Sequence, residues 1–247
     1  IVFLPPHRVV SGSNTRTALS SATLVHYVAL DGGNKTHSGQ TPIALLPKAN
    51  SLDLIFDTAD VFVTAVEAPK ISDAKLRLAL PNLLEDRLLT ETQDSHFAFV
   101  PSGQRAPGTP NNPARVPVAV IDRGLLTRAL DVMTDAGYRT RAAYSAIYTV
   151  PVPPPGALCV RVQGGQDVAR SGKHEGFSFE FDGKNPPAAL QLAVSQLGMR
   201  KIIAYGSEAL NLARFANDLG AAVEAAGHEL DVQASVDAVN LLQGAFA

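Results

Sequence analysis

The sequence has 247 residues, 46% of them hydrophobic, which is enough for one large domain or two ordinary domains with buried cores. Its formal net charge is −2 and it contains no run of basic residues, which argues against nucleic acid as a partner. Its single cysteine, Cys159, excludes an intramolecular disulfide and a zinc site made of several cysteines, and fits a reducing, cytosolic location.

The first hundred residues predict a mixture of strands and helices. Strands are expected where β-branched and aromatic residues concentrate, at 23–30, 43–46, 61–66 and 96–100. Ser72 is suited to cap a helix, which Pro81 should end because proline lacks the amide hydrogen and clashes with the preceding turn. A second helix is expected over 82–90.

The stretch 102–117 is rich in Pro, Gly and Asn and has almost no large apolar residue, so it predicts an exposed loop. A strand at 118–121, a helix at 124–135 and a strand at 138–144 are expected to follow. This strand-helix-strand unit would complete a first domain, and the proline-rich run 151–155 would be a stiff link to a second.

Residues after 157 show the clearest pattern. Apolar residues alternate with others over 158–163 and again over 177–182, which is the period of a β-strand. Gly164-Gly165 can supply the positive φ angles of a tight hairpin turn, with a return strand near 166–170. Three antiparallel strands are therefore predicted.

The period then changes to that of helices alternating with strands. We expect a helix from Asn185 to Gly198, a strand at 201–205, a helix from Ser207 to Gly227, a strand at 228–233 and a short helix at 235–242. Three meandering strands followed by this alternation is the element order of ribonuclease H-like domains, and two such domains in tandem make the actin-like architecture.

The predicted fold class is therefore α/β with mixed (α+β) sheets and two ribonuclease H-like lobes. The first lobe would span 1–148, with an inserted small subdomain at about 61–117, and the second lobe would span 149–247. Since element order carries fold and not function, the residues must supply the rest.

The actin-like architecture usually clamps a nucleotide, with glycine hairpins on the phosphates and carboxylates on magnesium. Here the first strand reads Leu4-Pro5-Pro6-His7 and contains no acid, and no acid precedes Gly164-Gly165. One glycine, Gly206, stands where an adenine-facing turn usually has two. We therefore predict no nucleotide or other cofactor, with an actin-like ATPase or nucleotide switch as the alternative.

Catalytic and metal-binding residues are also not predicted. Cys159 lies in an apolar strand without an adjacent base, which favours a buried structural thiol over a nucleophile. No two of the six histidines stand three or four residues apart, so no helix presents a pair of metal ligands. A hydrolase that uses Cys159 or a histidine remains a third reading.

Three parts of the sequence match one family. Residues 80–89 read Leu-Pro-Asn-Leu-Leu-Glu-Asp-Arg-Leu-Leu, and Asp-Ser-His-Phe-Ala follows at 94–98. Residues 118–123 read Val-Ala-Val-Ile-Asp-Arg and lead to Asp-Ala-Gly-Tyr at 135–138, and residues 240–247 read Asn-Leu-Leu-Gln-Gly-Ala-Phe-Ala. In order and spacing these segments resemble protein L of the type II secretion system, the GspL family.

The resemblance implies an inner-membrane protein whose cytoplasmic part is an actin-like module without nucleotide equipment. In that family this part recruits the secretion ATPase, protein E, through the N-terminal domain of protein E. The membrane and periplasmic parts contact protein M and the rest of the inner-membrane platform. The resemblance thus implies a scaffold and not an enzyme, and it leaves open a homodimer.

The helix expected at 82–90 is the candidate partner-binding surface, with Glu85, Asp86 and Arg87 as candidate residues. Neighbouring positions on a helix diverge by about 100°, so Glu85 and Asp86 are not a carboxylate dyad. The leucines of this helix are instead expected to pack into the inserted subdomain.

No stretch approaches the ~18 consecutive apolar residues of a membrane span, and the N-terminus lacks a signal-peptide pattern. The sequence starts at Ile1 without a methionine. We therefore expect a water-soluble piece of a longer, single-pass protein at the cytoplasmic face of the bacterial inner membrane. The segment 240–247 would precede the transmembrane helix in the family.

Overall fold

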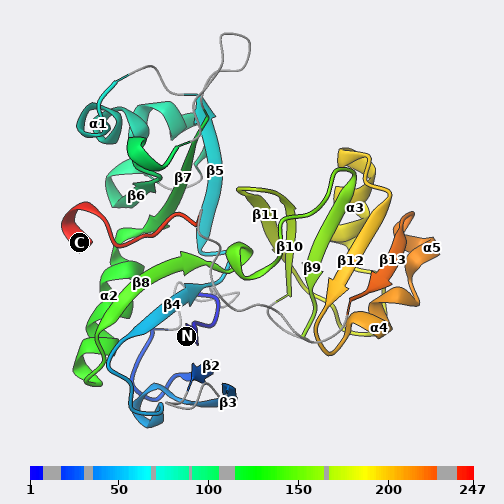
Figure 1. Cartoon of the computed structure of the whole chain (residues 1–247), viewed down its shortest axis with the longest axis horizontal. Coiled ribbons are helices and arrows are strands. Elements are labelled where there is room, and N and C mark those ends of the chain that lie inside the picture. The colour runs from blue at the N-terminus through cyan, green and yellow to red at the C-terminus, as the bar shows by residue number, and fades with distance from the viewer. Residues whose placement is uncertain are drawn as a thin grey trace. The chain divides into compact units, whose positions relative to one another are not determined.

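A computed structural model describes residues 1–7, 18–30, 36–67, 71–88, 91–105, 115–163, 167–226 and 238–247 (Figure 1). The chain divides into two compact units. The first is made of Ile1–Ser145 together with Asp237–Ala247, and the second of Ala146–Val236. The C-terminal residues, expected to close the second lobe, thus return to the first unit.

The first unit contains a five-stranded sheet with the strand order β3-β2-β1-β4-β8. Its strands are β1 (Val2–Phe3), β2 (Leu24–Leu30), β3 (Thr36–Pro42), β4 (Leu52–Phe56) and β8 (Thr140–Ser145). β1, β2 and β3 form an antiparallel meander, whereas β4 pairs in parallel with both β1 and β8. Helix α2 (Arg123–Asp135) packs against β8 and begins at Asp122, whose carboxylate accepts the Leu125 amide at 2.7 Å.

A three-stranded antiparallel sheet lies between β4 and β8 in the sequence. Its strands are β5 (Val61–Glu67), β6 (Ser95–Phe99) and β7 (Arg115–Asp122), in the order β5-β7-β6. Helix α1 (Asp73–Leu84) packs on it and buries Leu76, Leu80 and Leu84 completely. We call residues 61–122 the inserted subdomain. It extends beyond 117, because β7 pairs with β5 and β6 and not with the five-stranded sheet.

The second unit contains a sheet of order β11-β10-β9-β12-β13. Its elements are β9 (Ala157–Arg161), β10 (Asp167–Gly172), β11 (Glu175–Phe179), α3 (Ala188–Leu197), β12 (Lys201–Tyr205), α4 (Ala209–Ala213), α5 (Ala216–Leu219) and β13 (Ala222–Ala225). Again three strands form an antiparallel meander, and two more pair in parallel beside the first of them. The two sheets therefore share one topology, and the predicted mixed α/β class is confirmed.

The helix predicted from Ser207 to Gly227 is confirmed only in its first part, where the short helices α4 and α5 form, and its continuation past Gly220 is wrong. Gly220 adopts a left-handed conformation, with φ +68°, at the end of α5, so it terminates the helix instead of merely weakening it. Val223 then lies on strand β13, which pairs with β12. The helix expected to begin after Asn185 starts only at Ala188, but it does end at Gly198.

Several N-terminal elements also differ from prediction. The strand expected at 43–46 is the 3-10 turn η1 (Ile43–Leu45), and β4 was not predicted. Helix α1 continues through Pro81 and ends at Leu84, so the separate helix at 82–90 does not form. The strand expected at 118–121 begins at Arg115, and it lies in a different sheet from β8.

The C-terminal helix predicted at 235–242 is wrong for the residues that are described, since 238–243 have no helical conformation and only the 3-10 turn η6 (Gly244–Phe246) follows. The Gly164-Gly165 turn and the strand at 228–233 lie outside the described residues. Within the described ranges, no helix has the length and apolar character that a bilayer crossing requires.

Candidate functional site

The three candidate partner-binding residues form one short turn. Glu85, Asp86 and Arg87 make the 3-10 turn η2 (Glu85–Arg87), which continues α1 directly. All three are exposed, whereas Leu84 just before them is completely buried. Leu84 therefore anchors the turn to the core of the inserted subdomain, while the three charged residues are exposed.

Arg87 is fastened within the subdomain. Its guanidinium donates to the hydroxyl of Thr64 on β5 at 2.7 Å and lies 5.5 Å from the ring centroid of Phe62. Phe62 is 38% exposed, so the arginine covers part of an otherwise solvent-facing ring. Arg87 thus positions the end of α1, whereas Glu85 and Asp86 are exposed.

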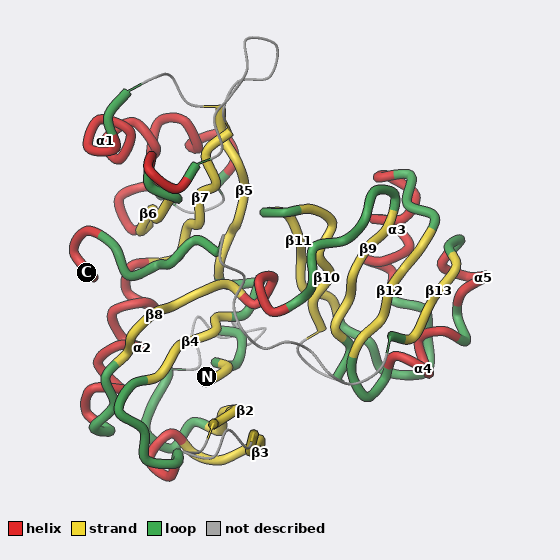
Figure 2. The backbone as a smooth tube through the Cα atoms, viewed as in Figure 1, coloured by secondary structure: helices red, strands yellow, loops and turns green. Residues whose placement is uncertain are grey.

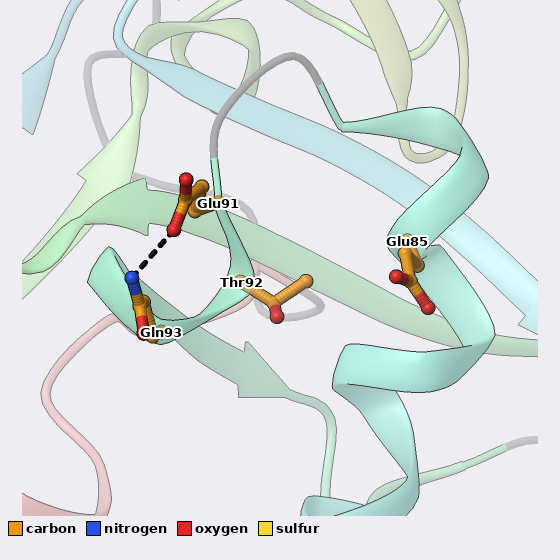
Figure 3. Close-up of a pocket in the computed structure, with 4 residues that line it drawn as sticks. All are labelled: Glu85, Glu91, Thr92 and Gln93. Atoms are coloured by element: carbon orange, nitrogen blue, oxygen red, sulfur yellow. Dashed lines mark hydrogen bonds between the residues drawn. The ribbon is translucent and has the colours of Figure 1, made fainter.

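A shallow hollow of about 280 Å³ lies between η2 and the turn η3 (Thr92–Asp94). Glu85, Glu91, Thr92 and Gln93 line it, and Figure 3 shows Glu85 on one wall with Glu91 and Gln93 on the other. The Gln93 side-chain amide donates to the Glu91 carboxylate and orients it. With two carboxylates and no basic residue in its lining, the hollow suits a cationic side chain.

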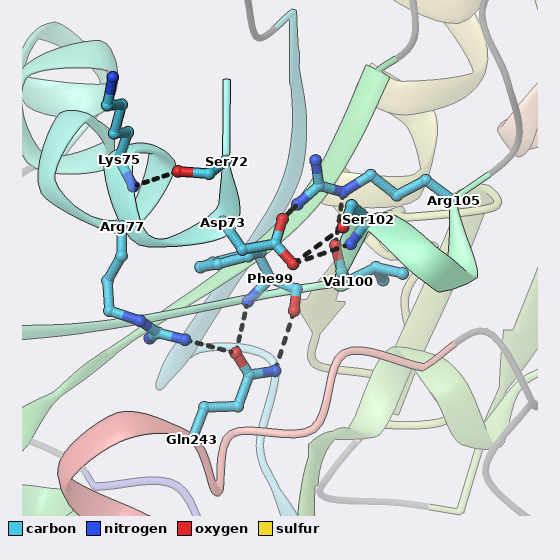
Figure 4. A network of polar contacts seen from close by, with 9 residues as sticks. All are labelled: Ser72, Asp73, Lys75, Arg77, Phe99, Val100, Ser102, Arg105 and Gln243. Atoms are coloured by element: carbon cyan, nitrogen blue, oxygen red, sulfur yellow. Dashed lines mark hydrogen bonds and ion pairs between the residues drawn. The ribbon is translucent and has the colours of Figure 1, made fainter. Parts of the chain in front are cut away.

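The opposite end of α1 is fixed by a charged cluster, shown in Figure 4. Ser72 caps the helix as predicted, since its hydroxyl accepts the Lys75 amide at 3.4 Å. The Asp73 carboxylate accepts the Ser102 amide at 3.0 Å and pairs with Arg105 at 2.7 Å. These contacts, the Ser102 amide first, lower the pKa of Asp73. Helix α1 is thereby held to the chain after β6.

The buried ring of Phe99 on β6 lies within cation–π distance of two arginines in the same cluster. The guanidinium carbon of Arg77 is 4.7 Å from the ring centroid, and that of Arg105 is 5.5 Å from it. Arg105 also donates to the Val100 carbonyl at 2.6 Å. Arg77 and Arg105 beneath α1 are thus used for packing, as Arg87 is at η2.

In the second unit, the residues near the turn considered for nucleotide binding have structural roles. Asp167 at the start of β10 is completely buried, and its two carboxylate oxygens accept the amides of Gln163 at 2.8 Å and Phe181 at 3.0 Å. Gly206 has φ +100°, and a Cβ there would lie 2.4 Å from the Val162 carbonyl oxygen. Both residues are therefore explained by packing inside the second unit.

Cys159 is a buried thiol on β9. Burial raises the pKa of Cys159, which disfavours the reactive thiolate. His174 is buried with its Nδ1 3.2 Å from the Tyr148 hydroxyl, and His96 is buried on β6. Across the described ranges, no three His, Cys, Asp or Glu side chains gather as metal ligands would.

The hollow could be only partly foreseen. Glu85 was predicted, but Glu91, Thr92 and Gln93 were not, because they lie on a separate turn that only the fold brings against η2. The polar run at 91–94 just before a strand was the available signal.

Two five-stranded sheets of one topology, with a subdomain inserted in the first, define an α/β protein of the actin-like class. The family model described as type II secretion system (T2SS), protein L, matches residues 26–247. The chain therefore belongs to the type II secretion system protein L family, as the resemblance indicated.

Individual relatives agree with this assignment. A type II secretion system protein L from Vibrio cholerae serotype O1 is 23% identical over 130 residues, 53% of this chain and 30% of the relative, so the match spans less than a third of that protein. The solved cytoplasmic domain of EpsL, an inner-membrane component of the type II secretion system of Vibrio cholerae, matches with a TM-score of 0.65 at 19% identity, covering 100% of this chain and 98% of that one.

A more distant likeness is to a chain of the PilM-PilN type IV pilus biogenesis complex. Its TM-score is 0.51 at 11% identity, with 86% of each chain covered. At these identities both structures show the fold alone, and they confirm the predicted actin-like architecture.

Proposed function

We propose that this chain is a cytoplasmic scaffold of the type II secretion inner-membrane platform, and that it recruits the secretion ATPase, protein E, by binding its N-terminal domain. The observation that carries the proposal is the family match over residues 26–247. The full-length likeness to a cytoplasmic domain of an inner-membrane component supports a place at the cytoplasmic face of that membrane. Protein M and other platform components are proposed as partners of parts of the protein outside this sequence.

The proposed docking surface is the acidic end of α1, made of Glu85 and Asp86 on η2 with the hollow beside them. Both residues are exposed, and the hollow adds the Glu91 carboxylate. The exposed ring edge of Phe62 and the side chain of Leu83, which is 41% exposed, give apolar area nearby. A partner with basic side chains around an apolar centre would complement this surface.

Calorimetric titration with the purified N-terminal domain of protein E tests the proposal. We expect a one-to-one complex with a Kd of roughly ten micromolar or tighter. The double variant Glu85→Lys and Asp86→Lys should weaken it about tenfold or more, because like charges then oppose the partner. Asp131→Lys, an exposed acid on α2, is the matched control and should change the Kd less than about twofold.

Two outcomes would contradict parts of the proposal. If no complex forms at tens of micromolar, the scaffold function fails. If a complex forms but the double variant binds normally, the docking surface lies elsewhere. Mg-ATP should leave the melting temperature unchanged, whereas a nucleotide bound at a hundredfold over its Kd would stabilise the protein by about 2.7 kcal/mol.

A further inference from the structure

The third sequence motif has a structural role that the proposed function does not use. Residues 240–243, here called the clasp, run as an irregular segment past β8 and β6 (Figure 2). Leu241 in the clasp and Val239 just before it are almost completely buried. The motif therefore behaves as part of the first unit, although nearly a hundred residues separate it from β8 in the sequence.

The clasp first pairs with the edge of the five-stranded sheet. β8 is the last strand in the order of that sheet, so its outward amides and carbonyls have no strand partner within it. The Leu241 amide donates to the Ala143 carbonyl at 2.8 Å, and the Asn240 side-chain oxygen accepts the Ala143 amide at 3.0 Å. Both outward polar groups of Ala143 are satisfied in this way.

The clasp then pairs with the edge of the three-stranded sheet. The side-chain amide of Gln243 accepts the Phe99 amide at 3.3 Å and donates to the Phe99 carbonyl at 2.9 Å, as a neighbouring strand would (Figure 4). The same side chain accepts from Arg77 of α1 at 3.3 Å and donates to the Asn240 carbonyl at 2.9 Å. One glutamine thus joins β6, α1 and the clasp.

A buried histidine adds a third attachment. His96 on β6 donates from its Nε2 to the Leu241 carbonyl at 2.7 Å. The Phe246 ring meets His96 edge to face, with 4.8 Å between the ring centroids. The clasp therefore contacts β8 on one side and β6 and α1 on the other, with directional bonds to each.

We propose that the clasp locks the inserted subdomain to the five-stranded sheet, so that the C-terminal residues and the subdomain move as one body. Asn240 and the Leu241 amide bind β8 of the sheet. The Leu241 carbonyl and Gln243 bind β6 of the subdomain, so Leu241 contacts both. A displacement of the C-terminal end is then passed to α1 and η2 through Arg77 and Gln243. The relevance of this coupling to ATPase docking rests on the proposed function.

Hydrogen exchange measures the lock without any partner protein. Gln243→Ala removes both bonds to Phe99, and we expect amides in 95–99 to exchange about tenfold faster. Peptides from β9 in the second unit should be unchanged. Gln191→Ala is the matched control, since that glutamine makes one bond at 3.0 Å to the Asp218 carbonyl on the exposed surface of the second unit. Unchanged exchange at 95–99 in Gln243→Ala would overturn the proposal.

A distance measurement separates local loosening from loss of the lock. Spin labels on Leu78→Cys of α1, 81% exposed, and Leu45→Cys of η1, 71% exposed, report the subdomain and the sheet separately, while native Cys159 is buried. We expect a narrow distance distribution that broadens when Gln243→Ala is added. An equally narrow distribution in that variant would also overturn the lock. Since neither measurement involves protein E, a failure of the docking proposal stays distinguishable.

Discussion

The two five-stranded sheets have the same strand order but are completed in different ways. In the second unit the five strands follow one another over 157–225, and only short helices come between them. In the first unit the inserted subdomain separates β4 from β8, and a segment from the C-terminal end covers β8. Within the described residues, the sheet of the second unit is thus built from consecutive strands, whereas the sheet of the first unit is interrupted by the subdomain that carries the candidate docking surface.

Each unit contains both buried and exposed charges, and one set from each unit can be compared. In the second unit Asp167, Arg161 and Arg170 are almost completely buried, and Arg170 donates to three backbone carbonyls, those of Val150, Gly172 and Lys173. In the first unit Glu85 and Asp86 remain exposed at the end of α1. Buried charges that are hydrogen-bonded to backbone groups stabilise a fold, whereas exposed charges on a rigid element are available to bind a partner.

The largest expected effect on stability comes from a substitution in the core of the second unit. Asp167→Ala removes the acceptor of the buried Phe181 amide and of the part-buried Gln163 amide, which should cost about 3 kcal/mol or more of unfolding free energy. Chemical denaturation followed by hydrogen exchange of 157–161 measures the loss. Asp182→Ala, an exposed aspartate beside the same sheet, should cost much less, and equal losses in the two variants would contradict this account.

A smaller loss of stability is expected when the pH is lowered, and it arises in the first unit. Burial, with help from Arg123 and Arg77, lowers the pKa of His96 below its ordinary value, while the Leu241 carbonyl opposes the shift. The unfolded chain then binds the proton more tightly, so stability falls as the pH drops below about 6.5. Denaturation of the native protein and of His96→Gln over this range should show a flatter profile for the variant, and parallel profiles would refute the assignment.

The smallest expected effect on stability comes from neutralising the two exposed acids of the first unit. Glu85→Gln with Asp86→Asn should change the free energy of unfolding by no more than about 0.5 kcal/mol, because neither side chain is buried. Thermal denaturation measures the change. A loss close to that of Asp167→Ala would mean that these acids hold the fold and are not a surface kept for binding.

Local patterns predicted the three antiparallel strands of the second unit well. The alternation after residue 157 predicted the meander of β9, β10 and β11, because the two-residue period of a strand shows as an alternation of apolar and other residues in the sequence. Gly220 was harder to interpret, since a glycine in a helical pattern either interrupts it weakly or ends it in a left-handed turn. Only the pairing of β13 with β12 decides between the two.

Helix α1 shows tertiary packing overriding a local rule. A proline inside a helix costs about 3 kcal/mol, which is why Pro81 was expected to end it. The stripe of Leu76, Leu80 and Leu84 continues across the proline, and each fully buried leucine contributes about 2 kcal/mol. Leu84, the one leucine of the stripe beyond Pro81, therefore offsets most of the cost of continuing the helix by one turn.

The candidate surface was predictable only in part for a related reason. Glu85 and Asp86 stand out in the sequence as charges beside buried leucines, so they could be proposed. Glu91 and the clasp could not, because their partners lie across turns or nearly a hundred residues away. The clasp even resembles a helix in sequence, since Leu241 and Leu242 suit one as well as they suit an irregular segment.

The occupied edges of β8 and β6 have a practical consequence for shortened versions of the chain. Unpaired strand edges invite pairing between molecules and lead to aggregation. Truncation before Asn240 would bare the outward groups of Ala143 and Phe99 at once, on two different sheets. Such a fragment would tend to self-associate even if each sheet still formed, so the last eight residues belong in any soluble fragment.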